Sequence, residues 1–248
     1  MDKLNPVNGL LRLLGPDDLA QFAPYLEEAH LGLNRVIEEP GRAIEHIYFP
    51  ERGLASVVAV SGTIEIEIGH FGTEGMTGLH VLSEITTSLH KVLIQIPVLA
   101  LRIQREAFLD VLHERPSARS LFNRYREAFA IQVQQTALAN GKFTIEQRLA
   151  RWLLMCQDRV GDEIPVTHDF LSLMLGVRRA GVTTALHLLE GNRLIASRRK
   201  LVVIRDREKL VQTAGESYGV AEAAYHRLVT EYSGLPGGRQ NRELSVAN

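Results

Sequence analysis

Hydrophobic and polar positions along the chain follow two different periods, one typical of strands and one typical of helices. Residues 35–103 contain short runs rich in β-branched and aromatic residues, separated by proline or glycine. In "TIEIEIG", Ile64, Ile66 and Ile68 alternate with Glu65 and Glu67, which predicts a strand with the isoleucines buried and the glutamates in water. Many short strands without long helices between them favour a β-sandwich or barrel, in which Pro97 must lie at an edge, bend or turn.

Helical spacing precedes and follows this region. Residues 15–31 predict short helical structure that begins at Asp17 and Asp18, with Leu19, Phe22, Leu26 and Leu31 as its apolar anchors. Residues 105–116 predict another short helix. Residues 144–160 predict an amphipathic helix that begins at a Thr144–Gln147 capping box. Cys156, the only cysteine, lies on the apolar side of that helix, so we expect an inert buried thiol.

One helix is predicted to be much longer than the others. It would begin with Ser117 as its cap and end at Asn140-Gly141. An apolar stripe recurs along it at steps of three and four residues, at Leu121, Phe122, Tyr125, Phe129 and Val133. Such a stripe packs either on its own domain or on a second copy of itself. The connecting position of the helix gives the second alternative, a homodimer, at least as much support as the first.

Residues 167–190 have the pattern of a helix-turn-helix. A helix of about two turns would begin at Thr167 and end at Gly176, where a positive φ is cheap, and a second helix would follow. A helical wheel at about 100° per residue places Ala180, Thr184 and His187 on the outward side of the second helix. Arg193–Ala196 and Leu201–Ile204 can pair as strands around a basic turn, which makes the unit a winged helix.

Charge is distributed unevenly in a chain whose net charge is only −1. Residues 1–75 carry 12 acidic and 5 basic residues, so the remainder carries a balance of +6. Between Arg178 and Lys200 there are six basic residues and one acid, Glu190. This basic cluster indicates a face built for a polyanion.

With these motifs in this order, residues 8–214 resemble the Crp/Fnr family of bacterial transcription regulators. The best matches are "IYFPERGLAS", "IGHFGTEGMTGL" and "FLSLMLGVRRAGVTTALHLLEGNRLI". The resemblance implies an α+β fold with an N-terminal antiparallel β-roll of the cyclic-nucleotide-binding, jelly-roll type. A long dimerisation helix and a C-terminal winged helix-turn-helix would follow. We therefore expect four segments, at residues 1–115, 116–140, 144–232 and a polar tail at 233–248.

The candidate effector pocket departs from the family pattern at its most important positions. Cyclic-nucleotide-binding members hold the ribose with a Gly-Glu pair and the phosphate with an Arg-Ser or Arg-Thr pair. The matching positions here are Gly78-Leu79 and Thr87-Ser88. Loss of a bidentate arginine removes the strongest contact to a phosphate, so we do not expect control by cyclic AMP or cyclic GMP in the usual mode. We assign no metal to His70, His80 or His90 and no cofactor to the chain.

The resemblance also gives roles to the candidate DNA-binding residues. Arg179 matches the family's base-reading arginine and is expected to contact guanine. Ala180 and Thr184 replace a glutamate and an arginine that other members carry, so we expect an operator that differs from the family consensus. The remaining candidates are expected to hold phosphates or line the DNA-facing side: Arg178, Thr183, His187, Arg198, Arg199 and Lys200.

The leading hypothesis is a cytoplasmic homodimer that binds double-stranded DNA at an inverted repeat, with RNA polymerase and an unknown small molecule as candidate further partners. The alternative is a β-roll module that binds a ligand or a protein and in which DNA binding is secondary or lost. No nucleophile elbow, Walker loop, dinucleotide fingerprint or zinc-spaced His/Glu set is present, so we do not expect an enzyme. No apolar run has the ~20 residues that a membrane span needs.

Overall fold

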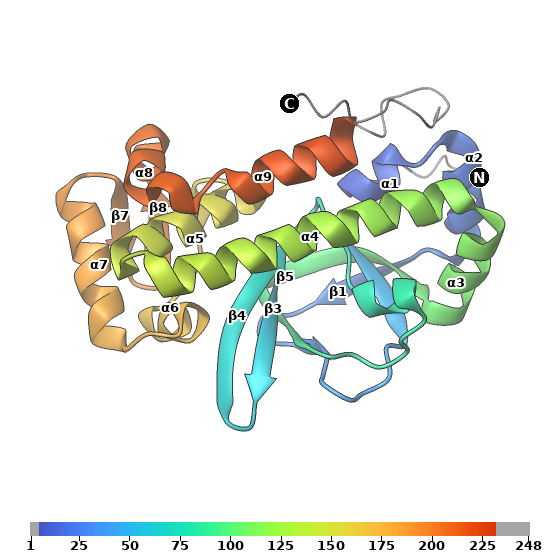
Figure 1. Ribbon diagram of the computed structural model, residues 1–248, viewed down its shortest axis with the longest axis horizontal. Helices are drawn as coiled ribbons and strands as arrows, with labels where there is room; N and C mark the ends of the chain where they lie inside the picture. The colour runs from blue at the N-terminus through green and yellow to red at the C-terminus, as the bar shows by residue number, and fades with distance from the viewer. Residues whose placement is uncertain (1–4, 232–248) are drawn as a thin grey trace, which may run out of the picture.

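The computed structural model describes residues 5–231 and has the expected α+β architecture (Figure 1). A rolled antiparallel sheet with short helices comes first, one long helix crosses the molecule, and a smaller helical part with its own sheet comes last. The polar tail expected at residues 233–248, and residue 232 of the third segment, lie outside the described residues.

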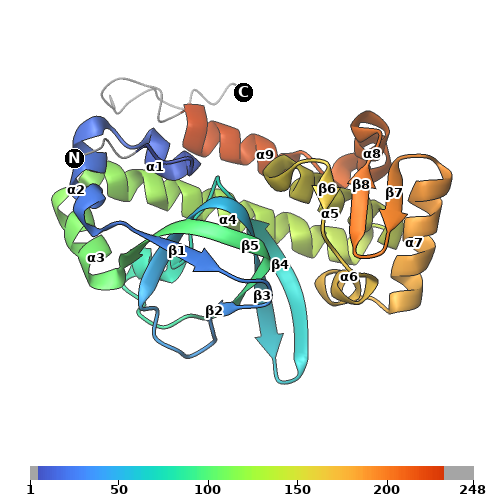
Figure 2. The ribbon, with the colours of Figure 1, turned by 180° about the vertical axis from the view of Figure 1, so that it is seen from behind.

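The N-terminal part is built around five antiparallel strands, which Figure 2 shows from behind. Their order is β1-β5-β3-β4, and β2 also pairs with β5. The elements are α1 (Gly9–Leu13), α2 (Pro16–Phe22), β1 (Glu27–Leu31), β2 (Val36–Glu38), β3 (His46–Ser61), β4 (Ile64–Phe71), β5 (Lys91–Gln104) and α3 (Arg105–Glu114).

Strand structure begins earlier than the sequence pattern indicated. Helix α2 ends at Phe22, and Pro24 lies in the 3₁₀ turn that follows, where an α-helix could not continue through it. Leu31, expected as a helical anchor, belongs to β1 and pairs with Val98 of β5. The partner strand is about seventy residues away along the chain, so local periodicity does not reveal it.

The prediction for the two faces of β4 is wrong. Ile64 is 69% exposed, whereas Glu67 is only 5% exposed. The Glu67 carboxylate accepts a hydrogen bond of 2.7 Å from the indole N–H of Trp152, in the C-terminal part. Both faces of this strand are covered, because Ile66 lies beside Gly176 while Glu67, on the opposite face, bonds to Trp152, so simple alternation does not apply.

Pro97 lies within β5 at an irregularity of the sheet, as expected for a proline in a strand. The register between β3 and β5 shifts on both sides of Gly53, which has a φ of +88°. A Cβ atom on Gly53 would lie 2.3 Å from the carbonyl oxygen of Pro97. Glycine is therefore required where the two strands approach at this bend.

The long helix, α4 (Pro116–Lys142), is slightly longer than predicted at both ends. It begins at Pro116, one residue before the expected cap. The Ser117 hydroxyl does not cap the helix and instead donates to the Asp18 carboxylate at 2.5 Å. It also continues through Asn140 and Gly141 to Lys142.

The apolar stripe of α4 packs within its own protomer. Leu121, Phe122, Tyr125 and Phe129 are each at most 8% exposed, and Val133 is half-buried. The Phe122 ring contacts aromatic rings from α2, β3 and α3. The four buried side chains are therefore not free to meet a second copy, and the expected dimer contact through them is wrong.

The C-terminal part is a helix-turn-helix flanked by a small sheet. Its elements are α5 (Ile145–Val160), β6 (Glu163–Ile164), α6 (His168–Leu175), α7 (Arg179–Gly191), β7 (Ile195–Arg198), β8 (Leu201–Ile204), α8 (Arg207–Ala214) and α9 (Val220–Tyr225), with a π-helical turn at His226–Glu231. The Thr144–Gln147 capping box at α5 is confirmed. Strand β7 begins two residues later than predicted because Arg193 has a φ of +62° and turns the chain first.

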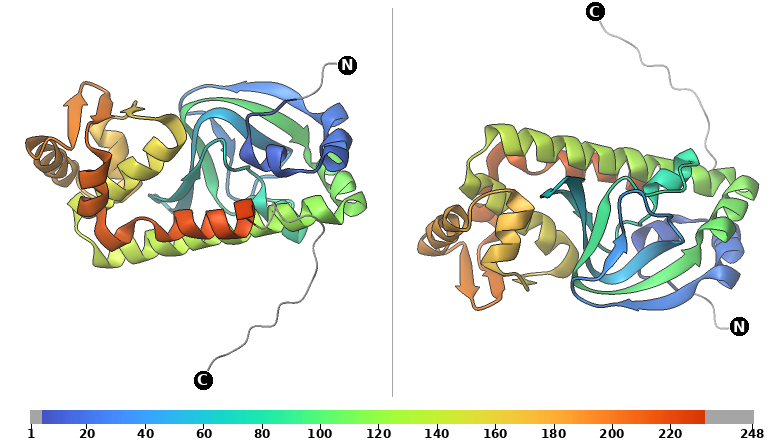
Figure 3. Two further views of the ribbon diagram at one scale, coloured as in Figure 1. Left: turned by 90° about the horizontal axis from the view of Figure 1, so that it is seen from above. Right: turned by 90° about the horizontal axis from the view of Figure 1, so that it is seen from below.

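The C-terminal part is docked on the sheet. Leu54 and Val58 of β3 share a core with α5, and the Gln95 amide of β5 lies 3.9 Å from the Cys156 sulfur, which is fully buried as expected. The last helical segment then returns alongside α4 (Figures 1 and 3), and the Tyr225 hydroxyl donates to the backbone carbonyl of Glu74. These contacts join the two ends of the molecule.

A buried carboxylate holds the segment between β4 and β5. Glu38, at the end of β2 and 7% exposed, accepts the Gly78 N–H at 2.8 Å with one oxygen and the Ser88 hydroxyl at 2.9 Å with the other. Burial raises the pKa of Glu38, and the hydrogen bonds from Ser88 and Gly78 oppose that rise only in part.

The position of Phe122 predicts a large effect on stability. We expect Phe122→Ala to lower the free energy of unfolding by about 3–5 kcal/mol, because the cavity cannot collapse among three other rings. Leu33→Ala, in the turn between β1 and β2 at a residue 58% exposed, is the control and should cost much less. Urea titration at several protein concentrations measures both, and equal costs would show that the stripe is not core.

The raised pKa of Glu38 predicts a pH dependence of stability. A carboxyl whose folded-state pKa is raised holds its proton more tightly when folded, so its contribution falls as pH rises above the ordinary value of 4.5. Glutamine cannot ionise, so the unfolding free energy of Glu38→Gln, relative to the parent, should increase between pH 4 and pH 8. Urea titrations across this range measure the difference in unfolding free energy between the variant and the parent. A difference that did not change with pH would show that burial does not raise the pKa of Glu38.

Candidate functional site

The α6–α7 pair has the geometry of a helix-turn-helix. The Thr167 hydroxyl caps α6 by accepting the Phe170 N–H at 3.1 Å. Gly176 ends the helix with a φ of +61°, as predicted. The inward side of α7 is formed by Val182, Ala185, Leu186 and Leu189, all buried against the same core as α5. The outward side of α7 is consequently left open.

The open side of α7 displays small, polar and apolar groups. Ala180, Thr184 and His187 are exposed and Thr183 is half-buried. The Thr184 hydroxyl donates to the Ala180 carbonyl at 3.1 Å, which leaves its oxygen free to accept. Leu188 is 48% exposed, four residues after Thr184 on the same side. We did not predict Leu188 from the sequence, although the helical wheel places it there.

The two arginines at the start of α7 have different surroundings. Arg178 is the N-cap residue and Arg179 the first helical residue, and both are exposed. The Arg179 guanidinium lies 3.1 Å from the Asp169 carboxylate of α6. A cation at a helix N-terminus is unfavourable, and Asp169 offsets this for Arg179 alone.

The wing adds exposed positive charge beside α7 (Figure 2). Arg198 ends β7, and Arg199 and Lys200 form the turn before β8. Over residues 5–231, neither these three side chains nor Arg178 takes part in an ion pair. The nearby acid, Glu190, is used locally, because its carboxylate accepts the Ser197 N–H at 2.8 Å. We call Arg178, Arg179, Arg198, Arg199 and Lys200 the basic surface.

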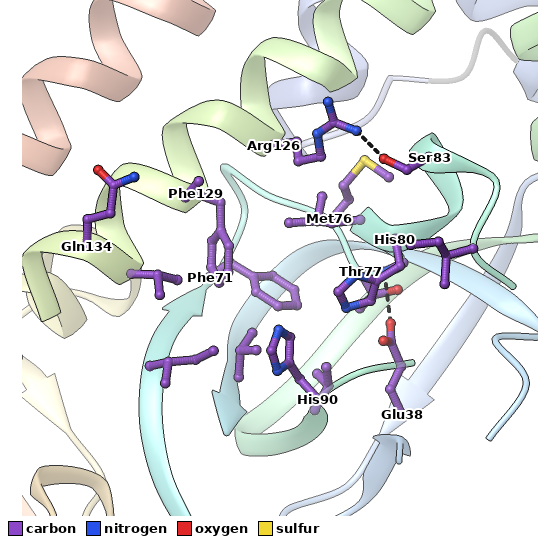
Figure 4. A pocket seen from close by; sticks show the side chains of 18 residues that line it. Glu38, Phe71, Met76, Thr77, His80, Ser83, His90, Arg126, Phe129 and Gln134 are labelled. Carbon is purple, nitrogen blue, oxygen red and sulfur yellow. Dashed lines mark hydrogen bonds between the residues drawn. The ribbon is translucent and has the colours of Figure 1, made fainter. Parts of the chain in front are cut away.

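A cavity of about 420 Å³ lies between the sheet and α4 (Figure 4). Of the four effector-pocket candidates, Gly78 and Leu79 line it. Ser88 lies behind the wall, bound to Glu38, and Thr87 is exposed. The structure therefore brings only half of the predicted set to the cavity.

Most of the cavity wall was not predicted for this site. Its floor includes Glu38, and its sides include His80, His90 and Arg126. Phe129, expected at a dimer contact, faces the cavity from α4 (Figure 4). These residues come from four separate segments, so no single motif in the sequence could have grouped them.

Two kinds of titratable side chain face the cavity: a pair of histidines whose pKa values are lowered, and an arginine that already has polar partners. The His80 and His90 rings lie 5.2 Å apart, and burial lowers the pKa of both. Repulsion from His90 lowers the pKa of His80 further. The Arg126 guanidinium donates to the Ser83 hydroxyl at 2.6 Å and lies 3.5 Å from the Glu127 carboxylate.

Residues 5–231 contain no cluster of metal ligands, because no three of their His, Cys, Asp or Glu side chains converge as metal ligands would. None of the helices described is long and apolar enough to span a bilayer.

Comparison with protein families identifies the C-terminal part. Residues 147–213 match the model of the Crp-like helix-turn-helix domain. This range contains α6, α7 and the wing that carry the basic surface. No curated protein matches the chain significantly.

Solved structures with the same fold include bacterial transcriptional regulators. FixK2 from Bradyrhizobium japonicum has a TM-score of 0.66 at 15% identity, covering 77% of this chain and 98% of its own. A CRP-family transcriptional regulator from Thermus thermophilus has a TM-score of 0.62 at 21% identity, covering 76% and 97%. The c-di-GMP responsive global regulator CLP from Xanthomonas campestris has a TM-score of 0.61 at 17% identity, covering 77% and 99%.

At these identities the solved structures establish only the fold of the chain. The family model identifies the C-terminal domain of the chain. The chain carries a Crp-like helix-turn-helix domain within the fold of the Crp/Fnr transcription regulators.

Proposed function

We propose that this chain is a sequence-specific DNA-binding transcription regulator that acts as a homodimer on an inverted-repeat operator. The observation that carries the proposal is the basic surface, where four of five cations lack an ion-pair partner in the described residues. Phosphates are the natural counter-charge for cations at a helix N-terminus and on a hairpin turn.

The geometry suggests separate roles along α7. In this proposal Arg179, the first residue of α7, donates two hydrogen bonds to a guanine edge. Arg178, Thr183 and the three wing residues hold phosphates. Leu188 and the methyl of Ala180 present apolar contacts of the kind that thymine methyl groups accept. With no carboxylate at position 180, the operator should differ from that of relatives that carry glutamate there.

The exposed side of α4 is the proposed dimer contact. Its stripe has helical spacing and consists of the half-buried Ala130 and Ile131, the exposed polar Gln134, and Leu138, which is 46% exposed. A parallel pair of α4 helices would place two α7 helices one DNA turn apart, ~34 Å.

The proposal places the chain in the cytoplasm, with RNA polymerase as a partner at the promoter, and assigns it no reaction. Control by cyclic AMP or cyclic GMP is not part of it, because Leu79 and Thr87 replace the ribose and phosphate contacts. The second candidate, a β-roll module with secondary DNA binding, is favoured by the cavity of about 420 Å³. Selection of bound DNA from a random pool distinguishes the two, since only the first yields a symmetric site.

The assignment of Arg179 predicts a loss of sequence discrimination. Using the selected operator and a scrambled copy, we expect Arg179→Ala to lose about 1–3 kcal/mol of binding to the operator and little to the copy. Arg199→Ala is the matched variant. It should weaken both DNAs alike and lower the slope of log affinity against log salt by about one.

These two variants separate base reading from phosphate contact. Mobility-shift titrations at several salt concentrations provide both quantities. If Arg179→Ala retained the parent's preference for the operator, the base contact would belong to another residue. A symmetric operator whose half-sites are not about one turn apart would contradict the α4 pairing.

The Arg179–Asp169 ion pair predicts a gain of affinity. Asp169→Asn should strengthen operator binding up to about fivefold, because exposed pairs are worth at most ~1 kcal/mol. Asp110→Asn on α3 changes the net charge equally but lies far from α7, so it is the control. Equal affinities for Asp169→Asn, Asp110→Asn and the parent would show that Asp169 does not restrain Arg179.

A further inference from the structure

We propose that the cavity between the sheet and α4 binds an uncharged, largely apolar small molecule, because an internal carboxylate has taken the place of a bound phosphate. Binding of this molecule to the cavity does not depend on the proposed contacts with DNA. Only its action as an effector rests on the proposed function.

Glu38 occupies the hydrogen-bond donors that the resemblance assigns to a nucleotide. Gly78 and Ser88 stand at the two positions of the cassette that still match the family. Their N–H and O–H groups point to the two oxygens of Glu38, at 2.8 and 2.9 Å. A nucleotide bound in the family's mode would meet these two donors already occupied, and its phosphate would also meet a carboxylate that is 7% exposed. Like charges in one buried site exclude each other.

The remaining cavity offers no free cation. Arg126 is engaged by Ser83 and by the Glu127 carboxylate. Burial lowers the pKa of both His80 and His90, which favours the neutral form of each imidazole. Neutral imidazoles donate and accept hydrogen bonds but do not compensate a ligand's charge.

The rest of the wall is suited to an apolar body. Its side chains include Val57, Ile68, Phe71, Met76, Val92 and Phe129. The Phe71 and Phe129 rings meet edge to face at a centroid distance of 6.5 Å. A volume of about 420 Å³ lies in the range of small-molecule sites, which bind mostly apolar ligands oriented by a few polar groups. We place the polar end of the ligand at His80 and His90.

The position of the cavity gives such a ligand a route to the proposed dimer contact. Phe129 and Val133 line it from α4, and Ala130 and Gln134 belong both to its wall and to the exposed stripe. A ligand would therefore contact the helix on which dimer pairing depends.

Two fluorescent probes with the same aromatic skeleton test the charge preference on the full chain. N-phenyl-1-naphthylamine is uncharged, and 8-anilinonaphthalene-1-sulfonate adds one sulfonate. We expect saturable binding of the uncharged probe at one site per chain, about tenfold tighter than the sulfonate, a difference of ~1.4 kcal/mol. Millimolar cyclic AMP should not displace it.

Two valine-to-phenylalanine variants locate the probe. Val133→Phe fills the cavity from α4 and should weaken the uncharged probe by about tenfold or more. Val211→Phe, on α8 at a residue 36% exposed, is the matched control and should leave binding unchanged. Circular dichroism checks the fold. If Val133→Phe does not fold, Ala130→Leu repeats the test with a smaller added side chain at another half-buried residue of the cavity wall.

Three results would overturn the proposal. The first is absent or weaker binding of the uncharged probe relative to the sulfonate. The second is displacement by cyclic AMP, and the third is unchanged binding in the folded cavity variant. Since no DNA is present, none of these results depends on operator binding, and failure of the operator experiments would leave the probe measurements intact.

Discussion

The packing of one side of α4 against the rolled sheet is the constraint on which the rest of the structure depends. Phe122 joins the aromatic core of the N-terminal part, and seven residues later Phe129 closes the cavity. Because this side is committed within the protomer, a second copy can use only the opposite side. The helix then leads directly into α5 and so sets the position of the helix-turn-helix.

Two buried glutamates add polar links between distant segments to the apolar contacts that join them. Glu38 ties together the ends of the segment between β4 and β5, and Glu67 ties β4 to Trp152 of the C-terminal part. A buried carboxylate is tolerated only where donors meet it, so each of these glutamates specifies one arrangement of distant segments. Glu38 helps to shape the cavity between the sheet and α4, and Glu67 helps to hold the C-terminal part against the sheet.

The sequence predicted best the elements whose determinants are local. The α6–α7 pair follows from the cap at Thr167, the glycine at position 176 and a 3.6-residue period over a few turns. Prediction failed where a segment is covered on both sides or paired far away along the chain. Strand β4 has Glu67 buried and Ile64 exposed, Leu31 lies in a strand, and the α4 stripe packs on its own protomer.

By itself, the sequence determined the recognition unit, its outward residues and the basic wing, because their spacing is set within single helices and one hairpin. It also showed that the usual ribose and phosphate contacts are missing. Only the tertiary structure showed that Glu38 binds Gly78 across 40 residues of the chain and that Trp152 binds Glu67 across 85. Burial depends on which distant segment covers a side chain, and periodicity along one segment carries no information about its partner.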